Sequence, residues 1–215
     1  IVVRLVGSEM CIRDSSQLGP RPVQMHLDAL EKMGANFELD HGVLIGKTDG
    51  LNGVEINLPY ASVGATENVL LAAVLAKGRT VIENAAREPE IVDIANMLIK
   101  MGANIIGAGT SEIIIEGVEK LAPTSHEIIG DRIVAGTFLA AILSTKGSGK
   151  INGINPEHLP MEIKKLNEMG AKIETNSTSI SVEYQDNLQA IELSTLPFPG
   201  AVSYTHLRAH ETDYY

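Results

Sequence analysis

Apolar residues in the middle of the chain follow two helical patterns. A nearly unbroken apolar stretch from Val69 to Leu75 stops at Lys77-Gly78, which predicts a largely buried helix ending at a glycine. Apolar residues then return every three or four positions, which predicts an amphipathic helix with Pro89 in its first turn and Gly102 at its end. The members of this second stripe are Ile91, Ile94, Leu98 and Met101.

Short β-like runs separate these helices. The predicted strands are Val54 to Leu58, Thr80 to Glu83, Asn104 to Ile106 and Glu112 to Glu116. The last two are joined through Gly107-Ala108-Gly109-Thr110, a glycine-rich turn. The predicted order of elements is therefore β-α-β-α-β-β.

This unit is one copy of an internal repeat. Met-Gly-Ala begins at Met33, Met101 and Met169, and the spacings are 101 − 33 = 68 and 169 − 101 = 68. A leucine stands three residues before each of these methionines, and a β-like run follows each alanine. A fixed period of this size indicates a supersecondary unit copied in tandem.

The third copy repeats the order of the complete unit, and the first copy keeps only part of it. In the third copy, Ile133 to Leu143 predicts a helix, Lys150 to Asn152 a strand, and Pro156-Glu157 the start of a second helix. The stripe of that helix is Leu159, Ile163, Leu166 and Met169, and Leu139-Ala140-Ala141 falls 68 residues after Leu71-Ala72-Ala73. The first copy keeps only a helix from Pro22 to Met33 and its closing strands, so the chain is predicted to begin and end inside a unit.

Both ends of the chain lack the repeat pattern. Residues 1–15 and 201–215 resemble translated sequencing-adapter read-through, and we expect them to be non-native tails outside the fold. We therefore expect the fold to lie within Ser16 to Gly200, which leaves out Cys11, the only cysteine.

Composition narrows the class of protein. A chain of 215 residues with 44% hydrophobic residues is long enough to bury a core. A net charge of −10 argues against a dedicated nucleic-acid binder, and no apolar run is long enough to cross a membrane. With one cysteine there is no internal disulfide, so we expect a soluble cytoplasmic protein.

Several motifs together resemble one enzyme family. The resemblance is carried by Arg21-Pro22-Val23, Ser62-Val63-Gly64-Ala65-Thr66, Glu83-Asn84-Ala85-Ala86-Arg87-Glu88-Pro89-Glu90, Gly107-Ala108-Gly109-Thr110 and Asp131-Arg132-Ile133. They are similar to motifs of the enolpyruvyl transferases named UDP-N-acetylglucosamine 1-carboxyvinyltransferase. The resemblance implies two similar domains, each an inside-out α/β barrel of three β-α-β-α-β-β units, with an active site between them. On that plan both domains are incomplete: residues 16–129 end the first, and residues 130–200 begin the second.

The family's reaction moves the enolpyruvyl group of phosphoenolpyruvate to the 3′-hydroxyl of UDP-N-acetylglucosamine, the first committed step of peptidoglycan synthesis. It needs an acid, a base and cations for phosphate and carboxylate, and the resemblance implies no metal or organic cofactor. Two alternatives stay open. One is a 5-enolpyruvylshikimate-3-phosphate synthase relative, which the run from Glu83 to Glu90 fits poorly, and the other is a non-catalytic nucleotide-sugar-binding paralogue.

The resemblance places two catalytic positions near the start of the segment. Arg21 matches the arginine beside the phosphate of phosphoenolpyruvate, and its alternative is a solvated arginine before a helix. Ser16 stands where the family keeps its reactive cysteine, and a serine hydroxyl is too weak an acid to replace it. The family's aspartate base would follow Pro199-Gly200, where this chain has other residues. We therefore expect this chain to be an inactive piece of an enzyme.

Two segments match the nucleotide-sugar site. The first is Pro22, Val23, Gln24 and Met25, where Gln24 replaces a common aspartate and Val23 fits a core position equally well. The second is Tyr60, Ala61, Ser62, Val63 and Gly64, which matches the loop around the uridine diphosphate. There Tyr60 replaces a lysine of some relatives, and Ser62 fits an ordinary helix cap as well.

Three further polar residues match the family's cleft. Glu88 is equally explained as a first-turn carboxylate, and Asp131 as a helix N-cap, although the motif favours cleft roles for Asp131 and Arg132. The histidines between Ser16 and Gly200 show no metal-ligand spacing, and we interpret them as surface or helix-end residues. They are His26, His41, His126 and His158.

Overall fold

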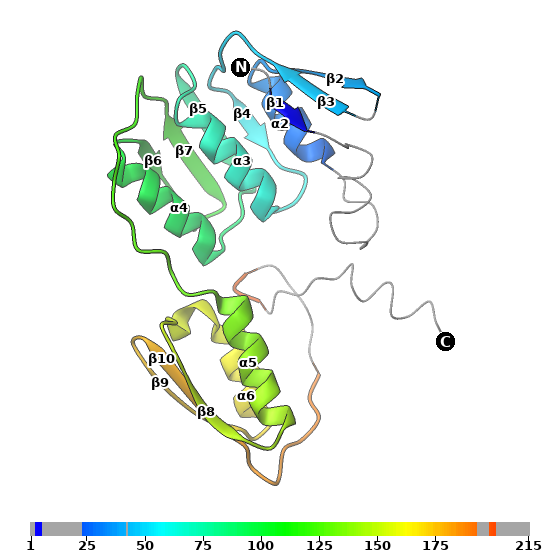
Figure 1. The fold of residues 1–215 in the computed structure, drawn as a ribbon, viewed down its shortest axis with the longest axis vertical. Coiled ribbons are helices and arrows are strands. Elements are labelled where there is room, and N and C mark those ends of the chain that lie inside the picture. The colour runs from blue at the N-terminus through cyan, green and yellow to red at the C-terminus, as the bar shows by residue number, and fades with distance from the viewer. Residues whose placement is uncertain (1–2, 6–22, 42, 193–197, 201–215) are drawn as a thin grey trace. The chain divides into compact units, whose positions relative to one another are not determined.

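The computed structural model describes residues 3–5, 23–41, 43–192 and 198–200. The chain divides between His126 and Glu127 into two compact units, each of which mixes helices and strands (Figure 1). The prediction of an α/β fold is confirmed. The barrel expected from the resemblance stays a prediction.

The first unit contains the complete repeat copy. Its sheet has the order β4 (Glu55–Asn57), β5 (Arg79–Glu83), β7 (Glu112–Glu116) and β6 (Asn104–Ile106). β4 runs parallel to β5, and the other two pairings are antiparallel. The helices α3 (Val63–Ala73) and α4 (Pro89–Lys100) lie side by side over one face of this sheet (Figure 1). The predicted β-α-β-α-β-β order is confirmed.

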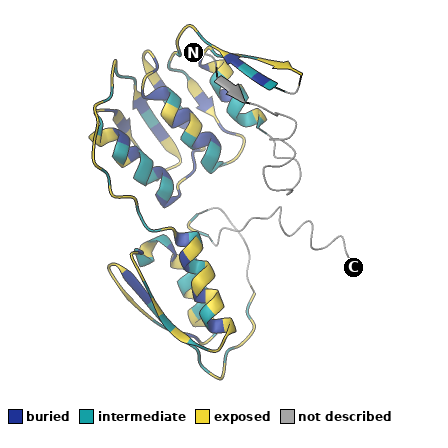
Figure 2. Ribbon diagram, viewed as in Figure 1, coloured by how far each residue is buried: buried dark blue, intermediate teal, exposed yellow. Residues whose placement is uncertain are grey.

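Alternation along the strands explains why the helices cover this face. Ile113 and Ile115 of β7 and Ile82 of β5 are fully buried, whereas the glutamates at the strand ends are exposed. Figure 2 shows buried and exposed positions mixed along the strands of this sheet. The largest fully buried side chains of the helices are Leu70 and Ile91. Burying such a side chain contributes about 1.5–3 kcal/mol, so this face holds the core of the unit.

The first unit also holds the closing part of the preceding copy. It consists of α2 (Gln24–Lys32), β2 (Asn36–Asp40) and β3 (Val43–Lys47), and α2 packs against α3. β3 pairs antiparallel with β2 on one side and with β1 (Val3–Leu5) on the other. β1 lies in the segment that we expected to stand outside the fold, and in the structure it extends this sheet.

The second unit repeats the plan from α5 (Arg132–Ser144) to β10 (Ser179–Glu183). Its sheet has the order β8 (Ser148–Asn152), β10 and β9 (Lys172–Asn176), with antiparallel pairings throughout. The core of this unit is a separate cluster that includes Leu139, Leu143, Ile154, Leu159 and Ile180.

The second helix of this copy differs from the prediction. Pro156–His158 form a single 3₁₀ turn, and the α-helix α6 begins only at Pro160 and ends at Glu168. The cause is Pro160, whose ring disfavours helical geometry at the residue before it. Leu159 accordingly has φ −129° and ψ 45°, and Pro160 takes the first helical position, where its missing N–H costs nothing.

The Met-Gly-Ala repeat is a helix terminator in all three copies. Its glycines have φ values of 105°, 102° and 97° at Gly34, Gly102 and Gly170. The alanine N–H that follows each glycine donates to the leucine carbonyl five residues earlier, which is the Schellman arrangement. The three bonds are Ala35 to Leu30 (3.0 Å), Ala103 to Leu98 (3.0 Å) and Ala171 to Leu166 (3.1 Å).

The methionine carbonyls of the same tripeptide have a second role. Each accepts a hydrogen bond from a residue that follows the closing strands of its own copy. The donors are the amides of Asn52 to Met33, Ala122 to Met101 and Gln189 to Met169, each at 2.8 Å. The repeated tripeptide therefore also fixes the path by which the chain leaves each copy.

The period of 68 does not hold throughout the copy. The N-caps Ser62 and Asp131 are 131 − 62 = 69 residues apart, and so are the buried pair Leu70 and Leu139. The match of Leu71 with Leu139 was therefore wrong by one residue, since Leu71 is 46% exposed and Leu139 is fully buried. The third copy is one residue shorter at the 3₁₀ turn, so the spacing returns to 68 residues between Leu98 and Leu166.

Candidate functional site

The loop from Tyr60 to Gly64 leads directly into α3. Ser62 is the N-cap, and its Oγ accepts a hydrogen bond from the Ala65 N–H at 3.3 Å. The alternative role of Ser62 as an ordinary cap is therefore present in the structure. The amides of Val63 and Gly64 lie in the first helical turn, where N–H groups lack intrahelical acceptors and the helix dipole is positive. This arrangement suits an anion.

A second loop is tied to this one by hydrogen bonds. The Thr66 hydroxyl donates to the Ser62 carbonyl at 2.8 Å and accepts from the Ala86 N–H at 3.0 Å. The Asn84 side chain donates to the Leu58 carbonyl at 2.9 Å, from a residue whose φ is 56°. The structure thus brings the segment that follows β4 against the segment that follows β5. These segments carry two of the matched motifs.

Glu88 closes the second of these segments and is buried, with 4% of its surface exposed. It occupies the N-cap position of α4, and its carbonyl accepts from the Ile91 N–H at 2.9 Å. Its side chain makes no capping hydrogen bond within the described residues. Glu88 therefore stands at the start of α4, where the alternative of a carboxylate that complements the helix dipole places it, and it is buried there.

The start of α2 lies against the start of α3. Gln24 is exposed and donates to the Asp28 side chain at 2.6 Å, whereas Met25 packs against the core of the first unit. His26 is half-buried, and its Nδ1 is hydrogen-bonded to Asn68 of α3. His26 was predicted to be a surface or helix-end residue, and it lies in the first turn of α2. Burial lowers the pKa of His26 because it disfavours the charged imidazolium.

Gly64 is packed closely by this histidine. A side-chain carbon added at Gly64 would lie 3.2 Å from Cε1 of His26. The two segments that match the nucleotide-sugar site therefore come together, one at the start of α2 and the other at the start of α3. Beside them an apolar cavity of about 580 Å³ is lined by Val23, His26 and Asn68 together with residues of β2 and β3.

Glu67 is a candidate that sequence analysis missed. It is half-buried on α3, one turn after the Ser62 cap. Burial raises the pKa of Glu67, and the nearby carboxylate of Glu90 raises it further. Perturbed carboxyl groups gather at functional sites, but only the packing of α3 and α4 reveals this one.

The candidates of the second unit lie at the start of α5. The Asp131 carboxylate accepts from the N–H groups of Ile133 (2.8 Å) and Val134 (3.0 Å), so Asp131 is the N-cap of this helix. Arg132 is buried, with 5% exposed, and its guanidinium carbon lies 5.4 Å from the ring centre of Phe198. A guanidinium at this distance from an aromatic ring is held by a cation–π contact.

Several predicted positions are not tested by the structure. Ser16, Arg21 and Pro22 lie outside the described residues, so their roles stay predictions. The expected cleft also stays a prediction, because each unit is described by itself.

The described residues contain no group of three or more His, Cys, Asp or Glu side chains placed to hold a metal ion. Within the same part of the chain, no helix combines the length and the apolar character that a membrane span requires.

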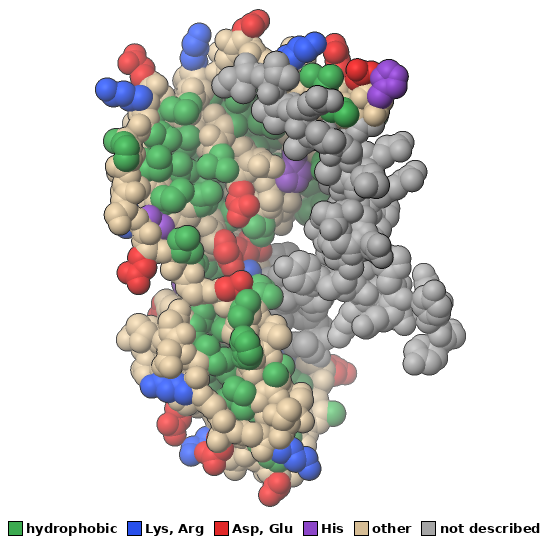
Figure 3. All heavy atoms as spheres, viewed as in Figure 1, with side chains coloured by type: hydrophobic (Ala, Val, Ile, Leu, Met, Phe, Trp, Pro, Cys, Tyr) green, Lys and Arg blue, Asp and Glu red, His purple; other side chains and the backbone are tan. Residues whose placement is uncertain are grey.

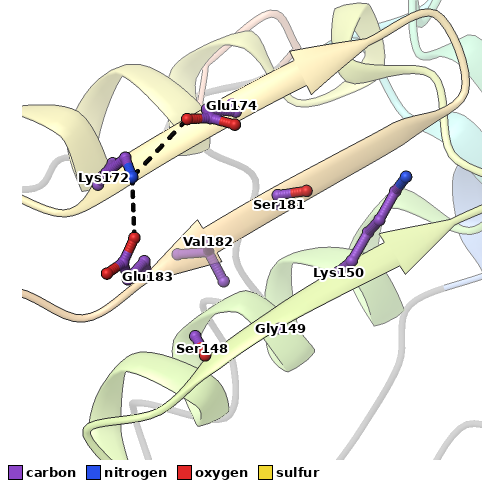
Figure 4. Close-up of a pocket in the computed structure, with 8 residues that line it drawn as sticks. All are labelled: Ser148, Gly149, Lys150, Lys172, Glu174, Ser181, Val182 and Glu183. Carbon is purple, nitrogen blue, oxygen red and sulfur yellow. Dashed lines mark hydrogen bonds and ion pairs between the residues drawn. The ribbon is translucent and has the colours of Figure 1, made fainter.

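A shallow hollow of about 370 Å³ lies on the sheet of the second unit (Figure 4). Lys172 of β9 reaches Glu183 at 3.0 Å and Glu174 at 3.8 Å across its floor. The hydrogen bond to Glu183 raises the pKa of Lys172, which is solvent-exposed. Exposed ion pairs of this kind contribute little to stability, and the hollow matches none of the predicted site residues.

Comparison with known proteins defines the protein family of this chain. A family model described as EPSP synthase (3-phosphoshikimate 1-carboxyvinyltransferase) matches residues 3–208. The enolpyruvyl transferase NikO from Streptomyces tendae has a similar fold, with a TM-score of 0.77 and 22% identity over 96% of this chain and 49% of that one. EPSP synthase from Acinetobacter baumannii has a TM-score of 0.58 at the same identity, over 85% of this chain and 43% of that one. The chain belongs to the EPSP synthase family.

Relatives with higher identity share a more particular name. A protein of Nocardia farcinica named UDP-N-acetylglucosamine 1-carboxyvinyltransferase is 46% identical over 93% of this chain and 47% of its own length. A protein of Streptococcus pneumoniae serotype 2 with the same name is 51% identical over 85% of this chain and 44% of its own length. The chain spans less than half the length of these relatives.

Proposed function

We propose that the protein to which this chain belongs transfers the enolpyruvyl group of phosphoenolpyruvate to the 3′-hydroxyl of UDP-N-acetylglucosamine. The observation that carries the proposal is the identity of 46–51% to proteins named for this substrate. The product is the first committed precursor of peptidoglycan, which links the protein to cell-wall biogenesis, cell shape and division. We place the reaction in the cytoplasm, with small-molecule substrates as the partners.

The start of α3 is proposed to hold the diphosphate of the nucleotide sugar. The amides of Val63 and Gly64 offer hydrogen bonds at the positive end of a helix, beside the cap Ser62. Val23, Gln24 and Met25 would contact the sugar nucleotide from the adjoining start of α2. The contact between His26 and Gly64 supports placing these two segments in one site.

The chemistry adds the oxygen of the sugar hydroxyl to C2 of phosphoenolpyruvate, while a base takes the hydroxyl proton and an acid protonates C3. Phosphate then leaves as a proton is lost from C3, which restores the enol double bond. Arg21 is proposed to neutralise the phosphate, and Asp131, Arg132 and Glu88 to line the reacting groups. Glu88 and Arg132 are buried, and buried charge is retained in proteins where it is paired or used.

The chain as it stands is expected to have no turnover. Ser16 cannot serve as the acid that the family's cysteine supplies, because a serine hydroxyl gives up its proton far less readily. Phosphate release from phosphoenolpyruvate and UDP-N-acetylglucosamine is the measurement. Measurable release by this chain would contradict the expectation.

A non-catalytic nucleotide-sugar-binding protein is the second candidate, and Ser16 is the observation that favours it. The two functions can be distinguished in a full-length chimera, in which this segment replaces the corresponding part of a relative. With Ser16→Cys, the proposed enzyme releases phosphate and a binding protein does not. Activity with shikimate 3-phosphate in place of the nucleotide sugar would overturn both and favour an EPSP synthase.

A further inference from the structure

The connection between the two units runs from Gly117 to Asp131 without helix or strand. Its first part is anchored to the first unit by backbone hydrogen bonds. The Gly117 N–H donates to the Gly78 carbonyl at 2.9 Å, and the Ala122 N–H donates to the Met101 carbonyl at 2.8 Å. Leu121 packs against the core of that unit.

The last anchor on the first unit is His126. Its Nε2 lies 2.9 Å from Oδ1 of Asp93 on α4, and its side chain is only 9% exposed. The Nζ of Lys100 lies 3.4 Å from Nδ1 of the same ring. A neutral imidazole with its proton on Nε2 satisfies both contacts, because Nε2–H donates to the carboxylate and Nδ1 accepts from the ammonium group. His126 was predicted to be a surface or helix-end residue, and this prediction was wrong.

The first anchor on the second unit is Gly130. A side-chain carbon at Gly130 would lie 2.1 Å from the carbonyl oxygen of Gly153, so the backbone at Gly130 packs closely against the turn after β8. Asp131 then caps α5. Only Glu127, Ile128 and Ile129 remain between the two anchors, and Ile128 is 78% exposed.

We propose that Asp93, His126 and Lys100 form a clamp that confines the flexible connection between the units to residues 127–129. Residues 117–122 are already held by Gly117, Ala122 and Leu121, so the clamp shortens the free segment from residues 123–129 to residues 127–129. A free segment of three residues has far fewer conformations than one of seven, because each unfixed residue adds backbone freedom. Residues 117–126 would then form a fixed part of the first unit, with His126 as its last anchored residue. The inference does not depend on the proposed function.

A protease that cuts after glutamate tests this directly, because Glu119 and Glu127 are both exposed and lie on opposite sides of the clamp. In the unaltered chain we expect rapid cutting after Glu127 and slow cutting after Glu119. Opening of residues 117–126 has to break the clamp as well as the bonds of Gly117 and Ala122. His126→Ala should therefore raise the Glu119 rate by about tenfold relative to the Glu127 rate, the size expected when a largely buried hydrogen bond to a charged group is lost. Cutting after Glu112, inside β7, reports global unfolding and serves as the internal reference.

Matched variants separate the clamp from general destabilisation. Asp93→Ala should reproduce the effect of His126→Ala, and the double variant should add nothing further, because the two residues act as one pair. Asp93→Asn keeps an acceptor oxygen and should have a smaller effect. His41→Ala is the control, since His41 contacts Asp40 at an exposed site outside the connection. Equal cutting after Glu119 and Glu127 in the unaltered chain, an unchanged ratio in both alanine variants, or additive effects would overturn the proposal.

Discussion

Single glycines decide where the helices of this chain end. Gly102 has a φ of 102°, and a side chain added there meets nothing within 4 Å. The requirement for glycine is therefore a matter of backbone conformation and not of space. This explains why a glycine stands at the same place at all three helix ends.

Gly102→Ala should destabilise the first unit by about 1–2 kcal/mol, because alanine resists the left-handed conformation. Urea unfolding followed by circular dichroism measures the change. Gly136→Ala is the control, since Gly136 lies within α5 and an added carbon there makes only an ordinary contact at 3.7 Å. That control should be neutral or stabilising, by up to about 1 kcal/mol. Equal losses in both variants would contradict this account.

His26 gives the first unit a pH-dependent stability. Burial lowers its folded pKa below the ordinary value of 6.5, so the unfolded chain binds the proton more readily. Stability should therefore be lost as the pH falls through 6.5 toward the lowered folded pKa, and be complete above 6.5. Urea midpoints at several pH values between neutrality and mild acid provide the measurement.

His26→Gln should flatten this pH dependence because glutamine does not titrate in the range. His41→Gln should leave it intact, since His41 is exposed. A slope that persists in His26→Gln would assign the effect to another group.

Helix caps explain how two of the candidate site residues are held. Asp131 caps α5 through two hydrogen bonds, and Ser62 caps α3 through one. Either residue replaced by alanine should cost about 0.5–2 kcal/mol of stability, with the larger loss at Asp131. Thermal unfolding measures both changes.

Asp131→Asn separates the cap from the proposed catalytic role. Asparagine caps helices as well as aspartate does, so stability should be kept. Within an active full-length protein, the loss of negative charge should reduce turnover if Asp131 takes part in the chemistry. Full turnover with asparagine would leave Asp131 a structural cap alone.

The positions of helices and strands could be predicted from the sequence more accurately than the contacts between residues of the candidate site. The strands Asn104–Ile106 and Glu112–Glu116 were predicted to the residue, because turn glycines and short apolar runs mark both of their ends. The α6 helix was predicted too long because Leu159 fits the apolar stripe, and the stripe does not report the effect of Pro160 on the residue before it.

The contacts of His26, Glu67 and His126 were not predictable in the same way. Each depends on residues far along the chain, such as Asn68 for His26 and Asp93 for His126. Local periodicity predicts which face of a helix is buried, but it does not predict which polar side chain of another element contacts that face. Their environments follow from how the copies pack together.

At the scale of the molecule, comparison of the units shows a helix face that is covered in one and open in the other. Ala65 and Val69 of α3 are fully buried, in a unit where α2 packs against α3. The equivalent positions of α5, 69 residues later, are Val134 and Phe138, which are 48% and 57% exposed. Hydrophobic side chains gather on the helical face of each unit in Figure 3.

An exposed pair of this kind, one turn apart on a helix, favours self-association of the chain. Phe138→Gln should therefore lower the association measured by sedimentation velocity without reducing the stability of the second unit. Leu139→Gln is the opposing control, because Leu139 is fully buried and its replacement should unfold the unit. If Phe138→Gln also unfolds the unit, Phe138 belongs to a core and the open face does not exist. If it folds and association persists unchanged, the contact between copies lies elsewhere, on surfaces such as the exposed Leu71 and Leu75 of the first unit.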